Sequence, residues 1–403
     1  MAVKIGNQPA TSHAAPASAP ATPRIPFPRA SRLKTNLSFS LGPTTLGASA
    51  VPFGPIQIPA NGYLRALNLE FNVVSTGNAA TTALNTNIGA DSPFSYVQQI
   101  SVTTSSGDAL IVPIDGYALA MVQKYGVFGM DAPYSDPRSD PTYTAITVGA
   151  GATSGSALFR LRIPFEIDQT TGFCSLPNLA ANRSYYVQGI YNALGTLFTT
   201  PPNGTVTCTI TATAEYWSVP NDTNAQGDPQ ETSPIGNGSF SVVQSETVPV
   251  NSGTGIYQMH NVGNVIRSII MIYRDSSNVR VPDANAPGIF ELVLNNDLLF
   301  YQTKNEFKRQ IANTGFGSVY GASGAAQNAP QGQDAGVWPF VQFLGAGQAK
   351  MRGDNTRNQY LPTLDATLLQ IRGTSWGSTG TVQVITNSIV PTSAAALYAP
   401  HIY

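Results

Sequence analysis

The chain has 403 residues, of which 11% are charged, less than half of the roughly 25% usual in soluble proteins. Because 42% of the residues are apolar, an intrinsically disordered chain of low hydrophobicity and high net charge is excluded. The net charge of -1 favours association over a freely soluble monomer. No run reaches the ~18 apolar residues of a membrane span, and the N-terminus lacks the apolar core of a signal peptide.

The N-terminal 35 residues form a basic arm that is rich in proline and alanine. Six of the 21 basic residues and none of the 22 acidic residues precede Glu70, so the remaining 15 basic and 22 acidic residues give the body a net charge of -7. The basic residues of the arm are Lys4, Arg24, Arg29, Arg32 and Lys34. We expect these side chains to contact a neighbouring subunit rather than the phosphates of nucleic acid or lipid, because segments that neutralise phosphates carry denser basic clusters.

The first half of the chain beyond the arm predicts strands interrupted by one helix. Segments with period-two alternation and many β-branched or aromatic residues are 36–41, 63–73, 96–102, 157–163, 184–190 and 205–217. Between the third and fourth of these, Asp115 is a suitable N-cap for a helix, and Gly126 is a suitable residue to end it.

After the almost wholly polar segment 220–237, the pattern begins again. Residues 266–273 resemble residues 64–71, which lie 202 positions earlier, and 239–243 resemble 38–41. Further strands are expected at 289–294, 337–344, 364–371 and 380–386. A second helix is expected from the helical spacing of Phe300, Thr303, Phe307 and Ile311, with Asp297 as its cap.

This repeated order of strands, helix and strands predicts an all-β protein made of two tandem jelly-roll β-barrels, each with a short helix, plus an extended N-terminal arm. The expected divisions are the flexible arm 1–35, a first roll 36–219, a linker 220–237, a second roll 238–393 and a C-terminal tail 394–403.

The residue inventory points away from catalysis and from a metal site. Cys174 and Cys208 form no CxxC pair and are interpreted as two buried thiols, although one disulfide is the alternative. With only three histidines, a triad or a zinc site would have to use His260 almost alone. The segment 315–321 lacks a phosphate-loop lysine, and the aspartates between 131 and 140 suit turn capping. We therefore predict no catalytic residue, no metal site and no cofactor.

The segments Phe159–Glu166, Leu176–Leu179 and Tyr185–Val187, together with the two β-rich halves and the arm, resemble the double jelly-roll major capsid proteins of tectivirus-like tailless icosahedral bacterial viruses. The resemblance implies homotrimeric, pseudo-hexameric capsomers that tile an icosahedral shell in the virion after assembly in the host cytoplasm. It also implies contacts with neighbouring capsomers, with minor capsid or vertex proteins and, in many members, with an internal lipid membrane. Sequence-specific nucleic-acid binding is not expected. The family's arm often contains a helix near the membrane, whereas here prolines between residues 9 and 28 interrupt the arm.

Two other classes of protein also fit a β-rich chain. A carbohydrate-binding or host-recognition spike protein would stack sugars on aromatic side chains. The candidates for this role are Tyr63, Tyr96, Tyr185, Tyr186 and Trp217, although their positions within strands are better explained by packing. A glycoside hydrolase requires two carboxylates that face one cleft, and no pair of acids stands out in the sequence.

Overall fold

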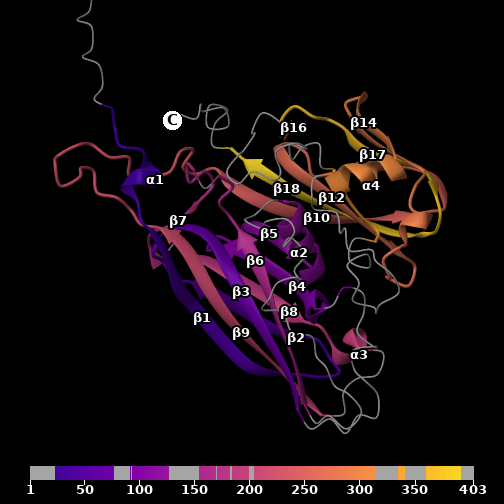
Figure 1. Cartoon of the computed structure of the whole chain (residues 1–403), viewed down its shortest axis with the longest axis horizontal. Helices are drawn as coiled ribbons and strands as arrows, with labels where there is room; N and C mark the ends of the chain where they lie inside the picture. The colour runs from indigo at the N-terminus through magenta and orange to yellow at the C-terminus, as the bar shows by residue number, and fades with distance from the viewer. Residues whose placement is uncertain are drawn as a thin grey trace, which may run out of the picture.

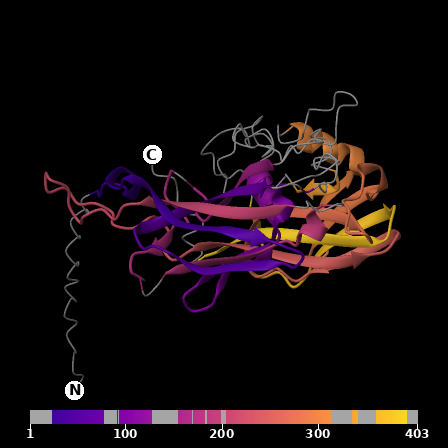
Figure 2. The ribbon, with the colours of Figure 1, turned by 90° about the horizontal axis from the view of Figure 1, so that it is seen from below.

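The computed structural model describes residues 23–76, 91, 93–126, 154–168, 170–181, 184–198, 204–313, 335–340 and 360–391. In this part of the chain, strands lie in stacked layers along the long axis of the molecule (Figures 1 and 2). The strands up to Trp217 form one roll, and those from Phe240 onward form a second roll.

The first roll has two sheets. Its strands are β1 (Leu33–Leu46), β2 (Val51–Ile58), β3 (Gly62–Thr76), β4 (Val97–Thr104), β5 (Ala109–Ile114), β6 (Ser154–Pro164), β7 (Leu176–Asn178), β8 (Tyr185–Tyr191) and β9 (Thr205–Trp217). One sheet has the order β1-β9-β3-β6, and the other has the order β2-β8-β4-β5. The short strand β7 pairs with β3.

The second roll repeats this arrangement. Its strands are β10 (Phe240–Val250), β11 (Gly253–Met259), β12 (Val265–Asp275), β13 (Ile289–Leu294), β14 (Asp297–Thr303), β15 (Val337–Pro339), β16 (Leu361–Pro362), β17 (Leu369–Trp376) and β18 (Gly380–Val390). The strands β10-β18-β12-β15 are neighbours in one sheet, and β11-β17-β13-β14 form the other. If β7 and β16 are set aside, both rolls place their first, last, third and sixth strands in one sheet. Two jelly rolls in tandem, as predicted, are confirmed.

The pairing register repeats as well as the strand order. Leu64 in β3 faces Leu176 in β7, and Ile266 in β12, 202 positions after Leu64, faces Leu361 in β16. The two short strands begin the similar segments Leu176–Leu179 and Leu361–Leu364. A bulge also interrupts β3 next to Arg65 and β12 next to Arg267, at equivalent positions opposite the last strand. The repeat of 64–71 in 266–273 is therefore confirmed at individual residues. The proposed repeat of 38–41 in 239–243 is wrong in register, because Ser241 lies opposite Ile389 as Leu33 lies opposite Trp217, so 239–243 corresponds to 31–35.

Helices and helical turns connect the strands. They are α1 (Phe27–Ala30), η2 (Phe94–Tyr96), α2 (Gly116–Tyr125), α3 (Leu194–Leu197), η5 (Asp283–Asn285) and α4 (Lys304–Asn313). The prediction for α2 is confirmed, because the Asp115 carboxylate caps its N-terminus by accepting a hydrogen bond from the Ala118 backbone N–H (2.8 Å) and Gly126 ends it.

The predicted start of the second helix is wrong. Asp297 does not cap a helix but begins β14, which contains Phe300 and ends at Thr303. Phe307 and Ile311 do lie on the buried side of α4. The helical spacing of Phe300 and Phe307 is misleading because both side chains enter the same core, one from the strand and one from the helix; their ring centroids lie 4.8 Å apart.

Several strands differ from the prediction. The strand expected at 364–371 begins only at Leu369, because residues 364 and 365 form a turn after β16. The strands β2, β5 and β11 were missed: β2 contains Pro52 and Pro55, β5 contains Pro113 and β11 begins Gly-Thr-Gly. Proline is tolerated in strands that use few ladder hydrogen bonds, and β2 lies at a sheet edge.

Buried apolar side chains of both rolls form one continuous core. Both rolls contribute aromatic side chains to it, such as the stacked pair Phe71 and Phe159 (4.9 Å between ring centroids) and the edge-on pair Phe290 and Phe307 (5.3 Å). None of the helices in the described ranges has the length and apolar character required to cross a bilayer.

Candidate assembly surfaces

The arm is attached to the first roll by an aromatic cluster that is separate from the main core. Phe27, the first residue of α1, is completely buried against the edges of Tyr63 and Trp217, with ring centroids 5.3 and 6.0 Å away. Gly172 leaves space for the phenylalanine ring, because a Cβ atom there would lie 3.2 Å from Phe27 Cε1. We call Phe27, Tyr63 and Trp217 the latch cluster.

Backbone contacts hold the same segment against the polar region between the rolls. Ile25 forms a parallel bridge with Gln230. Its N–H donates to the carbonyl of Pro229 (2.9 Å), and its carbonyl accepts from the N–H of Glu231 (3.0 Å). The Phe27 N–H donates to the Glu231 carboxylate (2.9 Å). The arm therefore leaves the body in a direction set by residues more than 200 positions away along the chain.

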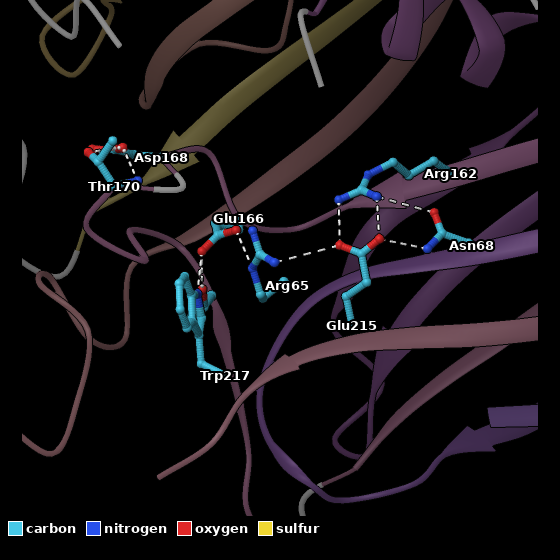
Figure 3. Close-up of polar contacts among 9 residues, drawn as sticks. Arg65, Asn68, Arg162, Glu166, Asp168, Thr170, Glu215 and Trp217 are labelled. Atoms are coloured by element: carbon cyan, nitrogen blue, oxygen red, sulfur yellow. Dashed lines mark hydrogen bonds and ion pairs between the residues drawn. The ribbon is translucent and has the colours of Figure 1, made fainter. Parts of the chain in front are cut away.

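A buried carboxylate supports the latch cluster from beneath. Glu166 accepts hydrogen bonds from Trp217 Nε1 (2.5 Å), from Arg65 Nε (2.6 Å) and from the Ser175 hydroxyl (3.3 Å), as Figure 3 shows for the labelled residues. The Arg65 guanidinium also lies over the Trp217 ring, 4.8 Å from its centroid. Burial raises the pKa of Glu166, and the charge of Arg65 and these hydrogen bonds oppose that shift.

A second carboxylate continues the network onto the outer face of the sheet. Glu215 accepts two hydrogen bonds from Arg162, one on each carboxylate oxygen (2.5 and 2.8 Å), and its Oε1 also accepts one from the Asn68 side-chain amide (2.8 Å). Its Oε2 lies 3.9 Å from Arg65 Nη1 (Figure 3). Burial alone would raise the pKa of Glu215, but the hydrogen bonds and charge of Arg162, with help from Asn68 and Arg65, outweigh it and lower the pKa. The network fixes the end of the sheet to which the arm is attached.

The predicted basic residues of the arm lie around this attachment but do not converge on one site. Arg24, Arg29, Arg32 and Lys34 are exposed, and within the described ranges none of their side chains forms an ion pair. Arg29 ends α1, and Lys34 lies in β1 opposite Tyr216. Lys4 lies outside the described residues. Phe27 was not predicted as the point of attachment, although it is the only Phe, Tyr or Trp among the first 35 residues.

A second surface joins the two rolls. Every residue of α2 is buried, because the helix packs against β4 and β6 of the first roll and against β12 and β18 of the second. Asp91 accepts from Arg274 and from Arg280 (2.6 Å each) across the joint, and both guanidinium groups lie over the Tyr117 ring of α2. The two rolls are therefore joined through a largely buried, charge-paired contact.

The remaining sequence candidates do not form a binding or catalytic site in the described ranges. Tyr63, Tyr96, Tyr185 and Trp217 are at most 8% exposed and pack as core residues, which leaves the half-buried Tyr186 alone among the five candidates for a sugar platform. His260 is exposed beside Glu246. Cys174 and Cys208 are both buried and do not form a disulfide with each other. Among the described residues, no group of three or more His, Cys, Asp or Glu residues is placed to hold a metal. Residues 131–140 and 315–321 lie outside the described residues.

No protein-family model and no curated protein matches this sequence. The structure is similar to that of the STIV major capsid protein, with a TM-score of 0.59 and 15% identity, covering 92% of this chain and 100% of that chain. It is also similar to a chain of the PBCV-1 virus capsid (TM-score 0.55, 10% identity, 89% and 93% covered) and to the Faustovirus major capsid protein (0.51, 8%, 89% and 90%). The chain thus has the double jelly-roll fold of these capsid proteins over nearly its whole length.

Proposed function

We propose that this protein is the major capsid protein of an icosahedral virus and acts by self-assembly rather than by catalysis. The observation that carries the proposal is the duplicated jelly roll, which matches structures of capsid proteins over about nine-tenths of this chain and of theirs. The low charge supports the same role, because charged side chains at many subunit contacts would have to lose their hydration.

In this proposal, three copies form a capsomer with six rolls, and the capsomers tile the shell. The divisions at 36–219 and 238–393 correspond to its two wall-forming rolls, with 220–237 as the connection. Minor capsid or vertex proteins, and an internal membrane beneath the shell, belong to the same proposal. It places the protein in the virion, after assembly in the host cytoplasm.

We assign the arm to contacts between subunits. Its exposed residues Arg24, Arg29, Arg32 and Lys34, together with Lys4, lie near or before the latch cluster, which fixes where the arm leaves the body. A segment tied to the body at one point and basic along its length suits a contact with the acidic body of a neighbouring copy.

Light scattering of the purified full-length chain tests the proposed function. We expect a stable trimer or larger closed assemblies. A monomer at all concentrations, with affinity for oligosaccharides, would instead favour the carbohydrate-binding alternative.

A separate deletion of residues 1–22 tests the arm. The truncated protein should still form trimers because the latch cluster is intact, but it should assemble into shells less efficiently. Shell assembly at the full-length rate would show that this part of the arm makes no necessary contact.

A further inference from the structure

Within one chain, the two rolls are joined edge to edge. The fifth strand of the first roll, β5, lies parallel to the first strand of the second roll, β10, with Ile111 opposite Val243. The pairing merges the two neighbouring sheets into one. The helix that follows β5, α2, then covers the outer face of β12 and β18: Gln383 of β18, which pairs with Ile272 of β12, donates a hydrogen bond to Asp115 at the start of α2.

Each of the two joined strands has a counterpart in the other roll: β14 corresponds to β5, and β1 corresponds to β10. β14 is the fifth strand of the second roll, and Leu299 bulges from it at the position where Leu110 bulges from β5. β1 is the first strand of the first roll and corresponds to β10. Each of the two lies at the edge of its sheet, and no described strand pairs with its outer side. Figure 1 shows β14 with α4 at the upper right of the molecule and β1 at the lower left.

Both free edges carry exposed apolar side chains. Leu298 and Tyr301 on β14 are each 56% exposed, and Leu33 and Leu37 on β1 are 60% and 66% exposed. With Leu299, these residues make up half of the ten large apolar side chains that are exposed in the described part of the chain. Unpaired strand edges with apolar side chains recruit another strand unless something protects them.

The sheet face beside β1 differs from its counterpart in a way that fits assembly. In the joint between the two rolls of one chain, α2 covers the paired residues Ile272 and Gln383 of the second roll. The equivalent pair in the first roll is Glu70 and Thr211. The outer face of β9 carries a row of threonines, namely Thr205, Thr207, Thr209, Thr211 and Thr213. The charges on this face are paired, Glu70 with Arg160 (2.7 Å) and Glu215 with Arg162 (2.5 Å). The uncharged threonines keep the face soluble before assembly and cost less to desolvate than charges do.

We infer that three copies close into a ring by repeating the joint between rolls from one chain to the next. β14 and α4 of one copy bind β1 and the outer face of β9 and β3 of the following copy. The two surfaces lie on opposite sides of the molecule, so the contact between copies is head-to-tail. A threefold rotation closes such a contact into a ring. The inference rests on the proposed function, which supplies the three copies.

The repeat also gives the register of this contact. Leu33 faces Trp217 just as Ser241 faces Ile389, so Thr35 occupies in β1 the position of Val243 in β10. Phe300 occupies in β14 the position of Ile111 in β5. The contact thus places Thr35 opposite Phe300 and, two residues earlier on each parallel strand, Leu33 beside Leu298.

Cysteine cross-linking tests this register. The full-length Leu33→Cys, Leu298→Cys double variant, treated with oxidised glutathione, should form covalent oligomers whose ladder stops at three chains. In the matched control, Leu298→Cys is replaced by Ile256→Cys, which is 59% exposed on β11 at the opposite edge of the same sheet. The control should give no such ladder, and the buried native cysteines should not react.

A second variant gives a readout that does not depend on disulfide formation. Leu298→Asp places a charge on an exposed position, so the fold measured by circular dichroism should persist while trimers dissociate in light scattering. Ile256→Asp should leave trimers intact. If the protein is a trimer but the designed pair does not cross-link and Leu298→Asp leaves the trimer unchanged, the inferred joint is wrong and the proposed function stands. If the unmodified protein is a monomer at every concentration, the proposed function itself fails.

Discussion

The latch cluster provides the most quantitative test of how the arm is attached. Phe27→Ala removes a ring that is completely buried and lies edge-on to Tyr63 and Trp217. Burial of a phenylalanine side chain contributes about 2–3 kcal/mol, and each edge-on aromatic pair adds about 0.5–1.5 kcal/mol. These contributions sum to about 3–6 kcal/mol, and a loss at the lower end, about 3 kcal/mol, already raises the fraction of molecules with an open latch by a factor of about 100.

Limited proteolysis with trypsin measures this change. Arg29 lies within the latched segment, and its cleavage follows the population of the open state when opening and closing are fast. The cleavage rate in Phe27→Ala should rise about 100-fold, whereas Val219→Ala, a change at a side chain that is 49% exposed, should leave it within a few-fold.

The midpoint of global unfolding should move little in Phe27→Ala, because the latch cluster is separate from the main core. An unchanged rate of cleavage at Arg29 would refute the assigned role of the latch cluster. A large loss of global stability would refute its independence from the core.

Three further changes probe the charge network, the joint between the rolls and the helix cap. Because the folded pKa of Glu215 is lowered, its contribution to stability is full above its ordinary value near 4.5 and is lost as pH falls through the folded value. Glu215→Gln should therefore be less stable at neutral pH and lose less stability on acidification, as measured by urea unfolding from pH 7 to 3; parallel curves would contradict this. Asp91→Ala leaves the almost fully buried Arg280 without this partner and should cost about 3 kcal/mol in urea unfolding, whereas a cost below about 1 kcal/mol would show that the joint does not depend on the pair. Asp115→Ala removes the N-cap of α2 and the acceptor of the Gln383 amide and should cost about 1 kcal/mol in urea unfolding; an unchanged free energy of unfolding would show that the cap does not stabilise the protein.

The local pattern of the sequence predicted most of the strands and the tandem repeat. Alternation marks β3 and β9 because each has one face in the core, and Asp115 with Gly126 marks α2 because capping depends on nearby backbone groups. The predicted start of α4 was wrong because Phe300 and Phe307 pack in the same core although one lies in β14 and the other in α4. The strand β2 was not predicted because its two prolines are unusual in strands and occur mainly at sheet edges, where β2 lies.

The assembly surfaces were harder to predict than the strands. Phe27 is the only aromatic residue of a proline-rich segment, so no periodic pattern marks it. Its partners Tyr63 and Trp217 lie in β3 and β9, where the alternating pattern predicts that their side chains are buried but does not identify the residue that covers them. Glu166 has no local signal at all, because Arg65 and Trp217, which surround it, are 101 and 51 positions away.

The sequence by itself determined the number of rolls, the polar connection between them, the basic arm and the scarcity of charge, since these follow from composition and from patterns a few residues long. Only the tertiary structure decided that β5 joins β10, that α2 is buried on every side and that β1 and β14 are left as free edges. The reason is that strand pairing brings together residues more than 100 positions apart, and the same alternating pattern suits a central strand or an edge.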